Sequence, residues 1–432
     1  MPTTALKPSN PPSSVSPAEH LRLAFISAWL LCSIFYFAQY ALRSAPGVML
    51  DELGAALALD KVALGSLVGL YYYTYAVFAI IAGAALDRSG PRGVVPAGIV
   101  AVALGAILFG MGEVFTAQTG RLLQGAGSAV AFTGAVYLAT RGFPKEWLAT
   151  AVGVTQCFGM LGGSAGQFAV GPMVRSVMPW QQFWFISGLM LLILAVGMAL
   201  ITPSRKTYES APAQSTSWIT MLAPYKTVLS NPQSWLCGVI AGLLFLPTTV
   251  FDMIWGVPFL REGMHVPISE AVARASMVPL GWVVGCPLLG YIADRIGRRK
   301  FVTIGGALLL AVTFAGVLYL PAGSAPPYVL GLLMGIGSGA AMIPYTVIKE
   351  VNPDEIKGSA TGAINCLVFS MTALINPWFG RMLAGMTPAG QPIGLAQFQQ
   401  AGSVLLGGVV LAIVLTFLLR ETGFAAQRPA PR

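Results

Sequence analysis

Long apolar runs separated by short polar segments recur along the whole chain. Each run has roughly the 20 residues that an α-helix needs to cross the hydrocarbon core of a bilayer. The pattern predicts an all-α integral membrane protein with twelve transmembrane helices. They are expected near 22–44, 62–86, 93–115, 117–140, 148–171 and 181–202, and then near 233–259, 269–292, 301–321, 327–348, 359–384 and 399–419.

A polar segment divides these runs into two sets of six. We therefore predict an N-terminal six-helix bundle at 21–202, a cytoplasmic linker at 203–232 and a C-terminal six-helix bundle at 233–420. The ends, 1–20 and 421–432, are predicted to be cytoplasmic tails, and the first is rich in Pro, Ser and Thr, as disordered segments are. The first apolar run is too long for a signal peptide and is expected to remain as a membrane anchor.

Composition supports lipid as the solvent of this chain. Hydrophobic residues make up 56% of it and charged residues only 9%, whereas soluble domains carry roughly 25% charged residues. The formal charge of +9 comes from basic residues in the short segments between apolar runs. That placement reflects membrane topology, so we expect no nucleic-acid partner.

The basic residues also predict the orientation of the chain. If both termini face the cytoplasm, all Lys and Arg residues fall in cytoplasmic segments except Arg43, Lys61, Arg121, Arg175, Arg261, Arg274 and Arg381. The positive-inside rule favours this arrangement. We expect a multi-pass protein of the bacterial inner membrane with cytoplasmic termini.

A ten-residue loop pattern occurs once in each set of runs, at 83–92 and at 290–299. Gly83, Asp87, Arg88, Gly90 and Arg92 align with Gly290, Asp294, Arg295, Gly297 and Arg299 at a constant offset of 207 residues. Other segments repeat at offsets of 209 and 210, among them Gly125 with Gly335 and Gln156 with Asn365. The chain is thus a duplication, and its halves should be related by an axis along the membrane normal.

The duplicated loop, with the twelve-span layout, resembles the signature of the major facilitator superfamily over essentially the whole chain. The resemblance implies alternating access, in which one half rocks against the other around a site near mid-membrane. It also implies that the loop is a latch for the outward-facing state. Carboxylates are favoured at helix N-termini by roughly 0.3–1 kcal/mol, so we expect Asp87 and Asp294 to contact helix N-termini of the opposite half. We expect the latch arginines to bond carboxylates or helix C-termini; the positive-inside rule alone would explain these arginines but not the aspartates.

Candidate substrate contacts lie on one face of the first span. Tyr36, Gln39, Tyr40 and Arg43 recur at i, i+3, i+4 and i+7. The planar fork of Arg43 suits a carboxylate or phosphate. The segment 40–44 is similar to the Tyr-x-Asp-Arg-Ser of the anion:cation symporter branch, which implies organic-anion binding by Arg43. Leu42 replaces that branch's aspartate, so its proton-coupling scheme does not carry over directly.

Asp252 and Trp255 are the candidates from the seventh span. Asp252 lies 42 residues before Asp294, and Arg43 lies 44 before Asp87. The two charges are therefore expected at similar depth, facing one cavity. There they could hold a zwitterion, pair with each other, or act as anion anchor and proton carrier. Alternatively, both are solvated near the outer ends of their helices.

Further polar residues in the spans complete the predicted site. Tyr71 and Tyr75 of the second span, Gln156 and Asn365 are candidates to line the substrate pocket, although interfacial tyrosines are also common. Arg121 stands in a segment similar to the second motif of the superfamily. A charge inside a span is usually functional, so Arg121 is a candidate for proton coupling or conformational coupling, with structural bracing as the alternative.

These observations favour a secondary active transporter that carries out proton-coupled uptake of a small organic anion or zwitterion, such as a carboxylate, amino acid or sugar acid. We expect it to be a monomer. An exporter of hydrophobic compounds or of a siderophore is the alternative, and a transport-like receptor is a more remote one. No enzyme motif, cofactor or metal site is expected. The two histidines lie outside the apolar runs, and none of the five cysteines forms a CxxC pair.

Overall fold

The computed structural model describes residues 17–204, 218–321, 323, 326–353, 356–388 and 391–423. Its first set of helices is α1 (Pro17–Ser44), η1 (Ala45–Val48), α2 (Leu50–Leu57), α3 (Lys61–Ser89), α4 (Pro91–Gly110), α5 (Val114–Gly142), α6 (Lys145–Phe168), α7 (Val170–Ser176) and α8 (Trp180–Ile201). A separate helix, α10 (Trp218–Ser230), follows in the predicted linker.

The second set begins with α11 (Pro232–Leu246), two π-helical stretches, η2 (Pro247–Gly256) and η3 (Phe259–Gly263), and α12 (Ile268–Ala275). It continues with α13 (Met277–Ile296), α14 (Arg299–Tyr319), α15 (Pro327–Ser338), η4 (Gly339–Met342), α16 (Ile343–Glu350), α17 (Lys357–Met386) and α18 (Leu395–Leu418).

Eleven helical segments in the described residues are long and apolar enough to cross a membrane. They coincide with eleven of the twelve predicted spans. The remaining prediction, 148–171, corresponds to α6, which has 24 residues and runs beside the other long helices. Its five glycines and its Thr, Gln and Ser residues lower its hydropathy without shortening it. The all-α membrane fold predicted from the sequence is confirmed.

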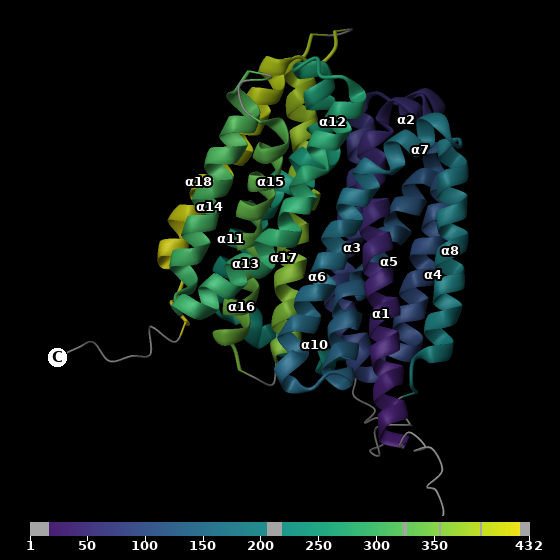
Figure 1. Ribbon diagram of the computed structural model, residues 1–432, viewed down its shortest axis with the longest axis vertical. Coiled ribbons are helices and arrows are strands. Elements are labelled where there is room, and N and C mark those ends of the chain that lie inside the picture. Colours follow the sequence, from purple (N-terminus) through teal and green to yellow (C-terminus); the bar gives the residue numbers. More distant parts are fainter. Residues whose placement is uncertain are drawn as a thin grey trace, which may run out of the picture.

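The long helices gather in two bundles that lie side by side (Figure 1). The bundle drawn in purple to teal contains α1 to α8, and the bundle drawn in green to yellow contains α11 to α18. Between them, α3 packs along α17 and α6 packs along α13. We call these bundles the N-terminal and C-terminal halves.

The duplication is visible in the packing of the two halves. A Cβ added at Gly125 of α5 would lie 2.0 Å from the carbonyl oxygen of Tyr71 on α3. A Cβ added at Gly335 of α15 would lie 2.0 Å from the carbonyl oxygen of Val278 on α13. Tyr71 and Val278 are 207 residues apart, which is the offset of the duplicated loop. Glycine thus sets the same close backbone approach in both halves.

The two halves are joined at both ends of the helices. At one end, the buried Tyr225 of α10 donates a hydrogen bond to the carbonyl oxygen of Ile80 on α3, 3.1 Å away, and its hydroxyl also lies against Gly362 of α17. At the other end, where α2 and α12 lie (Figure 1), two inter-half ion pairs join Asp51 to Arg261 and Lys61 to Glu262. The charge pattern of the sequence predicts that this second end faces outward.

The duplicated loop turns on glycine in both halves. Gly90 and Gly297 follow α3 and α13 with φ of 72° and 69°, a region that favours glycine. In the second loop, Arg299 donates to Asp294 at 2.5 Å and to Glu350 at 3.0 Å. Asp294 is therefore bonded within its own half in this conformation, not to a helix of the opposite half. The side chain of Asp87 lies outside the part of the chain that the structure describes.

Gly125→Ala and Gly335→Ala are each expected to lower the thermal stability of the purified protein. The added methyl group would push apart two helices at a backbone contact, and overpacking of this kind costs about 1–3 kcal/mol. Gly305→Ala on α14 is the control, because no atom lies within 4 Å of its added Cβ. Melting in detergent measures the effect, and equal melting temperatures for all three variants would contradict this account.

Candidate functional site

A small cavity lies between the two halves, near the middle of the long helices. Both halves contribute side chains to this central cavity, which is lined by Tyr36, Tyr40, Tyr75, Phe132, Gln156, Phe245, Met342, Tyr345, Asn365 and Phe369. Its volume is about 10 Å³, close to the minimum that holds one water molecule. The cavity is therefore nearly closed in this conformation.

Five of the predicted substrate contacts, namely Tyr36, Tyr40, Tyr75, Gln156 and Asn365, line this cavity. The two amides matched by the sequence repeat have equivalent partners. The Tyr36 hydroxyl donates to Oε1 of Gln156 at 3.3 Å, and the Tyr345 hydroxyl donates to Oδ1 of Asn365 at 2.8 Å. Each half thus places one tyrosine–amide pair against the cavity.

Arg43 lies directly behind the cavity wall inside an aromatic cage. Its guanidinium carbon is 4.1 Å from the ring centre of Tyr40, 5.3 Å from that of Tyr75 and 5.0 Å from that of Phe369, and these three rings also line the cavity. Tyr71 and Tyr72 complete the cage at 4.9 and 5.6 Å. Only 2% of Arg43 is exposed. The rings stabilise the buried cation through their negative faces.

The hydrogen bonds of Arg43 are incomplete. Nη2 donates to the Tyr71 hydroxyl at 3.2 Å, and that hydroxyl donates to Oε1 of Gln39 at 2.7 Å. Nε and Nη1 of Arg43 and Nε2 of Gln39 are buried without a hydrogen-bond acceptor. Among the described residues no carboxylate pairs with Arg43. Unmet donors on a buried cation are costly, and an anionic ligand would satisfy them.

Arg121 is equally buried but has a full set of acceptors. Nε and Nη2 donate to the carbonyl oxygen of Val68 at 3.3 and 3.1 Å, and Nη1 donates to the carbonyl oxygen of Leu42 at 3.4 Å. Nη1 also donates to Oε1 of Gln124 at 2.7 Å. Arg121 thereby ties α5 to α3 and to α1, next to Arg43. This is the geometry of a brace, which was one of the two roles considered from the sequence.

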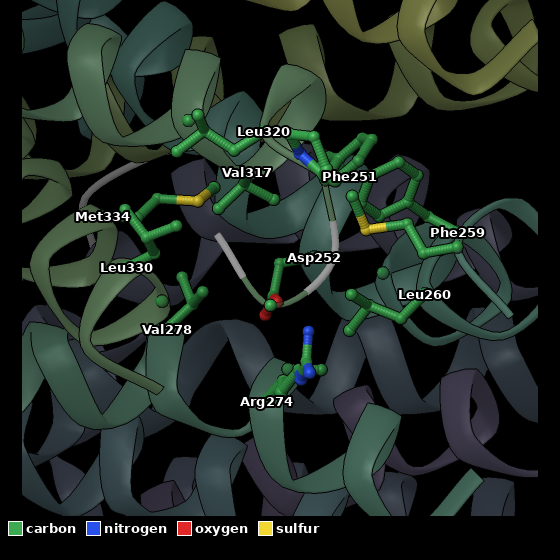
Figure 2. Close-up of a pocket in the computed structure, with 17 residues that line it drawn as sticks. Phe251, Asp252, Phe259, Leu260, Arg274, Val278, Val317, Leu320, Leu330 and Met334 are labelled. Carbon is green, nitrogen blue, oxygen red and sulfur yellow. The ribbon is translucent and has the colours of Figure 1, made fainter. Parts of the chain in front are cut away.

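Asp252 lies in a different environment from Arg43. It is 5% exposed and lines a second cavity, inside the C-terminal half (Figure 2). Arg43 is not among the residues that line this cavity. The carboxylate of Asp252 accepts a hydrogen bond from Nε2 of Gln167 on α6 at 3.4 Å. No ion pair joins Asp252 to Arg43 among the described residues, so the shared cavity expected from the sequence is not observed in this conformation. Similar depth in the membrane does not place two side chains on the same helix face.

Trp255 is a contact between the halves and does not line the central cavity. Its fully buried ring lies against Gly65 of α3, where an added Cβ would be 2.6 Å from Cζ2. The ring centre of Phe379 on α17 is 6.1 Å away. The π-helical turn of η2 directs Trp255 toward the helix interface and Asp252 toward the second cavity.

Several lining residues were not predicted from the sequence. Phe369 follows Asn365 by four residues on α17, so the helical period could have indicated it. Tyr345, Phe245 and Phe132 carry no such signal, because aromatic residues are common on buried faces of any span. They became recognisable only when the two halves were placed together.

The chain belongs to the Major Facilitator Superfamily, whose sequence profile matches residues 32–377. It is therefore a multi-pass integral membrane protein of a family of secondary transporters of small molecules, not an enzyme. The fold agrees with the crystal structure of a bacterial homologue of the human lysosomal transporter Spinster. That comparison has a TM-score of 0.72 and 15% identity, and covers 95% of this chain and 99% of the other.

Two relatives carry names that describe different functions. The membrane sensor protein UhpC of Salmonella typhimurium is 24% identical over 83% of this chain and 84% of its own length. The cis,cis-muconate transport protein of Acinetobacter baylyi is 23% identical over 90% of this chain and 94% of its own length. One relative is thus a sensor and the other a transport protein.

Arg121→Lys is expected to lower thermal stability, because a lysine ammonium cannot reach acceptors on α1, α3 and α5 together. Losing hydrogen bonds donated by a buried charged group costs about 1–3 kcal/mol. Arg381→Lys is the control, since that side chain is exposed and its Nε donates to its own helix. If Arg121→Lys melts like the control and changes only the pH dependence of transport, Arg121 acts in proton coupling and is not a brace.

Proposed function

We propose that this protein takes up a small organic anion or zwitterion by symport with protons. The observation that carries the proposal is the caged Arg43, a buried cation with donor groups that no atom of the described residues accepts. A carboxylate or phosphate would supply the missing acceptors with charge-assisted hydrogen bonds. The relative that is a cis,cis-muconate transport protein supports an organic anion as cargo.

The surroundings of Arg43 suit a small molecule with an apolar body. Aromatic rings form the wall between Arg43 and the central cavity, and the amides of Gln156 and Asn365 lie across the same space. The rings would contact the carbon skeleton, while the amides and tyrosine hydroxyls would orient polar substituents. Because the cavity is nearly closed, the substrate enters when the halves move apart and the rings of Tyr40 and Tyr75 turn aside.

Asp252 is our candidate for the proton carrier. It is the only acidic residue that is buried, with 5% exposure, in the part of the chain the structure describes. Its partner Gln167 belongs to the opposite half, so a change in its charge bears on the contact between halves. We also propose that both termini are cytoplasmic and that the transporter acts as a monomer.

A receptor that binds the same anion without moving it is the second candidate. The sensor UhpC supports it, since this chain resembles that protein over most of both lengths. Purified protein in liposomes separates the two functions. A transporter accumulates labelled anion inside the vesicles, whereas a receptor binds the anion and produces no flux.

Arg43→Ala is expected to abolish uptake and to raise the Kd of the anion by at least about thirtyfold, because removing one partner of a buried charge pair costs roughly 2–5 kcal/mol. Arg43→Lys keeps the charge but loses the fork, and is expected to bind the anion weakly. Thermal-shift binding against carboxylates, amino acids and sugar phosphates, followed by uptake into proteoliposomes, measures both effects.

Arg381→Ala on α17 removes an exposed arginine and serves as the control. Uptake by Arg43→Ala at the wild-type rate would sink the proposal. Transport of hydrophobic compounds that survives Arg43→Ala but fails when Tyr40 and Phe369 are changed would instead indicate the exporter.

A further inference from the structure

The C-terminal half contains a second cavity, separate from the central one and larger. Its volume is about 60 Å³, and because a water molecule needs about 10–15 Å³ of such space, it has room for several waters. Its rim includes Leu320, Pro321 and Gly323, which are exposed where α14 has ended. We call it the C-terminal cavity, and Arg274 and Ala275 of α12 line it. Figure 1 shows α12 at the same end of the molecule as α2, the end with the inter-half ion pairs.

Ionisable groups face each other across this cavity, while the walls are largely apolar. Figure 2 shows the Asp252 carboxylate and a side-chain nitrogen of Arg274 directed toward one another, with Val278, Leu330 and Leu260 around them. Arg274 is already paired, since its Nη2 and Nε donate to Glu270 at 2.5 and 3.1 Å. No salt bridge between Arg274 and Asp252 occurs among the described residues. Asp252 is thus reached from the surface but is not neutralised there.

Gln167 of the N-terminal half is hydrogen-bonded to Asp252. Its Nε2 donates to both the side-chain and the backbone oxygen of Asp252, each at 3.4 Å. Its Oε1 is buried and has no donor. An O–H group on Asp252 would provide that donor. The amide of Gln167 can therefore donate through Nε2 to the carboxylate, or flip and accept through Oε1 from the protonated carboxyl group. The cavity therefore ends at a protonation site that touches the opposite half.

We infer that the C-terminal cavity is the entry route of the coupling proton, and that the proton and the anion take separate paths through the protein. The inference rests on the proposed symport. A proton from water in the cavity binds an oxygen of Asp252, and the resulting O–H donates to Oε1 of Gln167. Release returns the proton to water and restores the carboxylate.

The groups around Asp252 are consistent with this route. Arg274, with Glu270 behind it, is the charged group that faces Asp252 from α12. The other elements that line the cavity, η3, α13, α14 and α15, present Leu260, Val278, Val317 and Met334, none of which titrates. Gln167 of α6, which contacts Asp252 from the other half, does not titrate either. Because Glu270 balances the charge of Arg274, the mouth does not repel a cation strongly.

Asp252→Asn is expected to lose accumulation of cis,cis-muconate driven by an inward proton gradient in proteoliposomes, while muconate binding and muconate counterflow persist. Val317→Phe, which fills the cavity from α14, is expected to give the same loss. Val312→Phe is the matched control, since Val312 lies on the same helix but is 70% exposed. It should accumulate muconate like the wild type.

The possible results separate this inference from the symport itself. If Asp252→Asn loses muconate binding, Asp252 belongs to the anion site and the separate path is wrong. Accumulation that survives in either Asp252→Asn or Val317→Phe also overturns the route, as does accumulation driven by sodium instead of protons. Failure of the wild type to accumulate muconate, or full activity of Arg43→Ala, counts against the proposed function.

A labelling experiment tests the route without any transport. Asp252→Cys is treated from the outer face with aminoethyl methanethiosulfonate, and adducts are counted by mass spectrometry against the wild type, whose five cysteines give the background. One additional adduct is expected, and it should disappear in the double variant with Val317→Phe. The absence of an additional adduct, or its persistence in the double variant, would show that the cavity is not the path to Asp252.

Discussion

A guanidinium group buried in a membrane protein needs its charge stabilised and its N–H groups supplied with acceptors. The two buried arginines of the N-terminal half differ in how these needs are satisfied. Arg121 donates to backbone carbonyls of two helices and to Gln124. Arg43 has its charge stabilised by the surrounding aromatic rings. Two of its nitrogens, Nε and Nη1, have no acceptor among the described residues. The first arrangement is complete within the protein and fixes three helices. The second leaves donors open, and under the proposed function a bound anion completes it, which would distinguish a binding residue from a brace.

The duplicated frame carries charges that are not duplicated. The close backbone contacts at Gly125 and Gly335 repeat, with the added Cβ 2.0 Å from a carbonyl oxygen in each. The charges do not repeat. Arg121 aligns with Gly331, and the cation Arg43 stands at nearly the same distance from its loop as the anion Asp252. A symmetric frame allows the halves to rock about one axis. The unequal charges let each half serve a different cargo, so under the proposed function the N-terminal half binds the anion and the C-terminal half receives the proton.

The sequence predicted the helices and part of the site for clear physical reasons. Span length is imposed by the bilayer, and the spacing of Tyr36, Gln39, Tyr40 and Arg43 places them on one helix face. Asp252 was less predictable. Asp252 lies 42 residues before its loop aspartate and Arg43 lies 44 before its own, and this difference of two residues turns a side chain by about 200° around an α-helix. The π-helical turns of η2 rotate the side-chain directions further. Sequence spacing therefore bears on the depth of the two charges and does not determine the direction of their side chains. Tyr345 and Phe369 reach the cavity only through the docking of the two halves, which local patterns do not encode.

The inter-half ion pairs at the α2 end connect the shape of the protein to the medium around it. Asp51, Lys61 and Arg261 are partly exposed, and interactions between exposed charges weaken as salt shortens the Debye length from about 30 Å at 0.01 M to about 10 Å at 0.1 M. Under the proposed orientation, with both termini in the cytoplasm, the free energy of these ion pairs is therefore set partly by the ionic strength outside the membrane. Under that orientation, a higher salt concentration in the medium weakens the contact between the halves at this end without any change in the substrate, so the balance between conformations also depends on the medium.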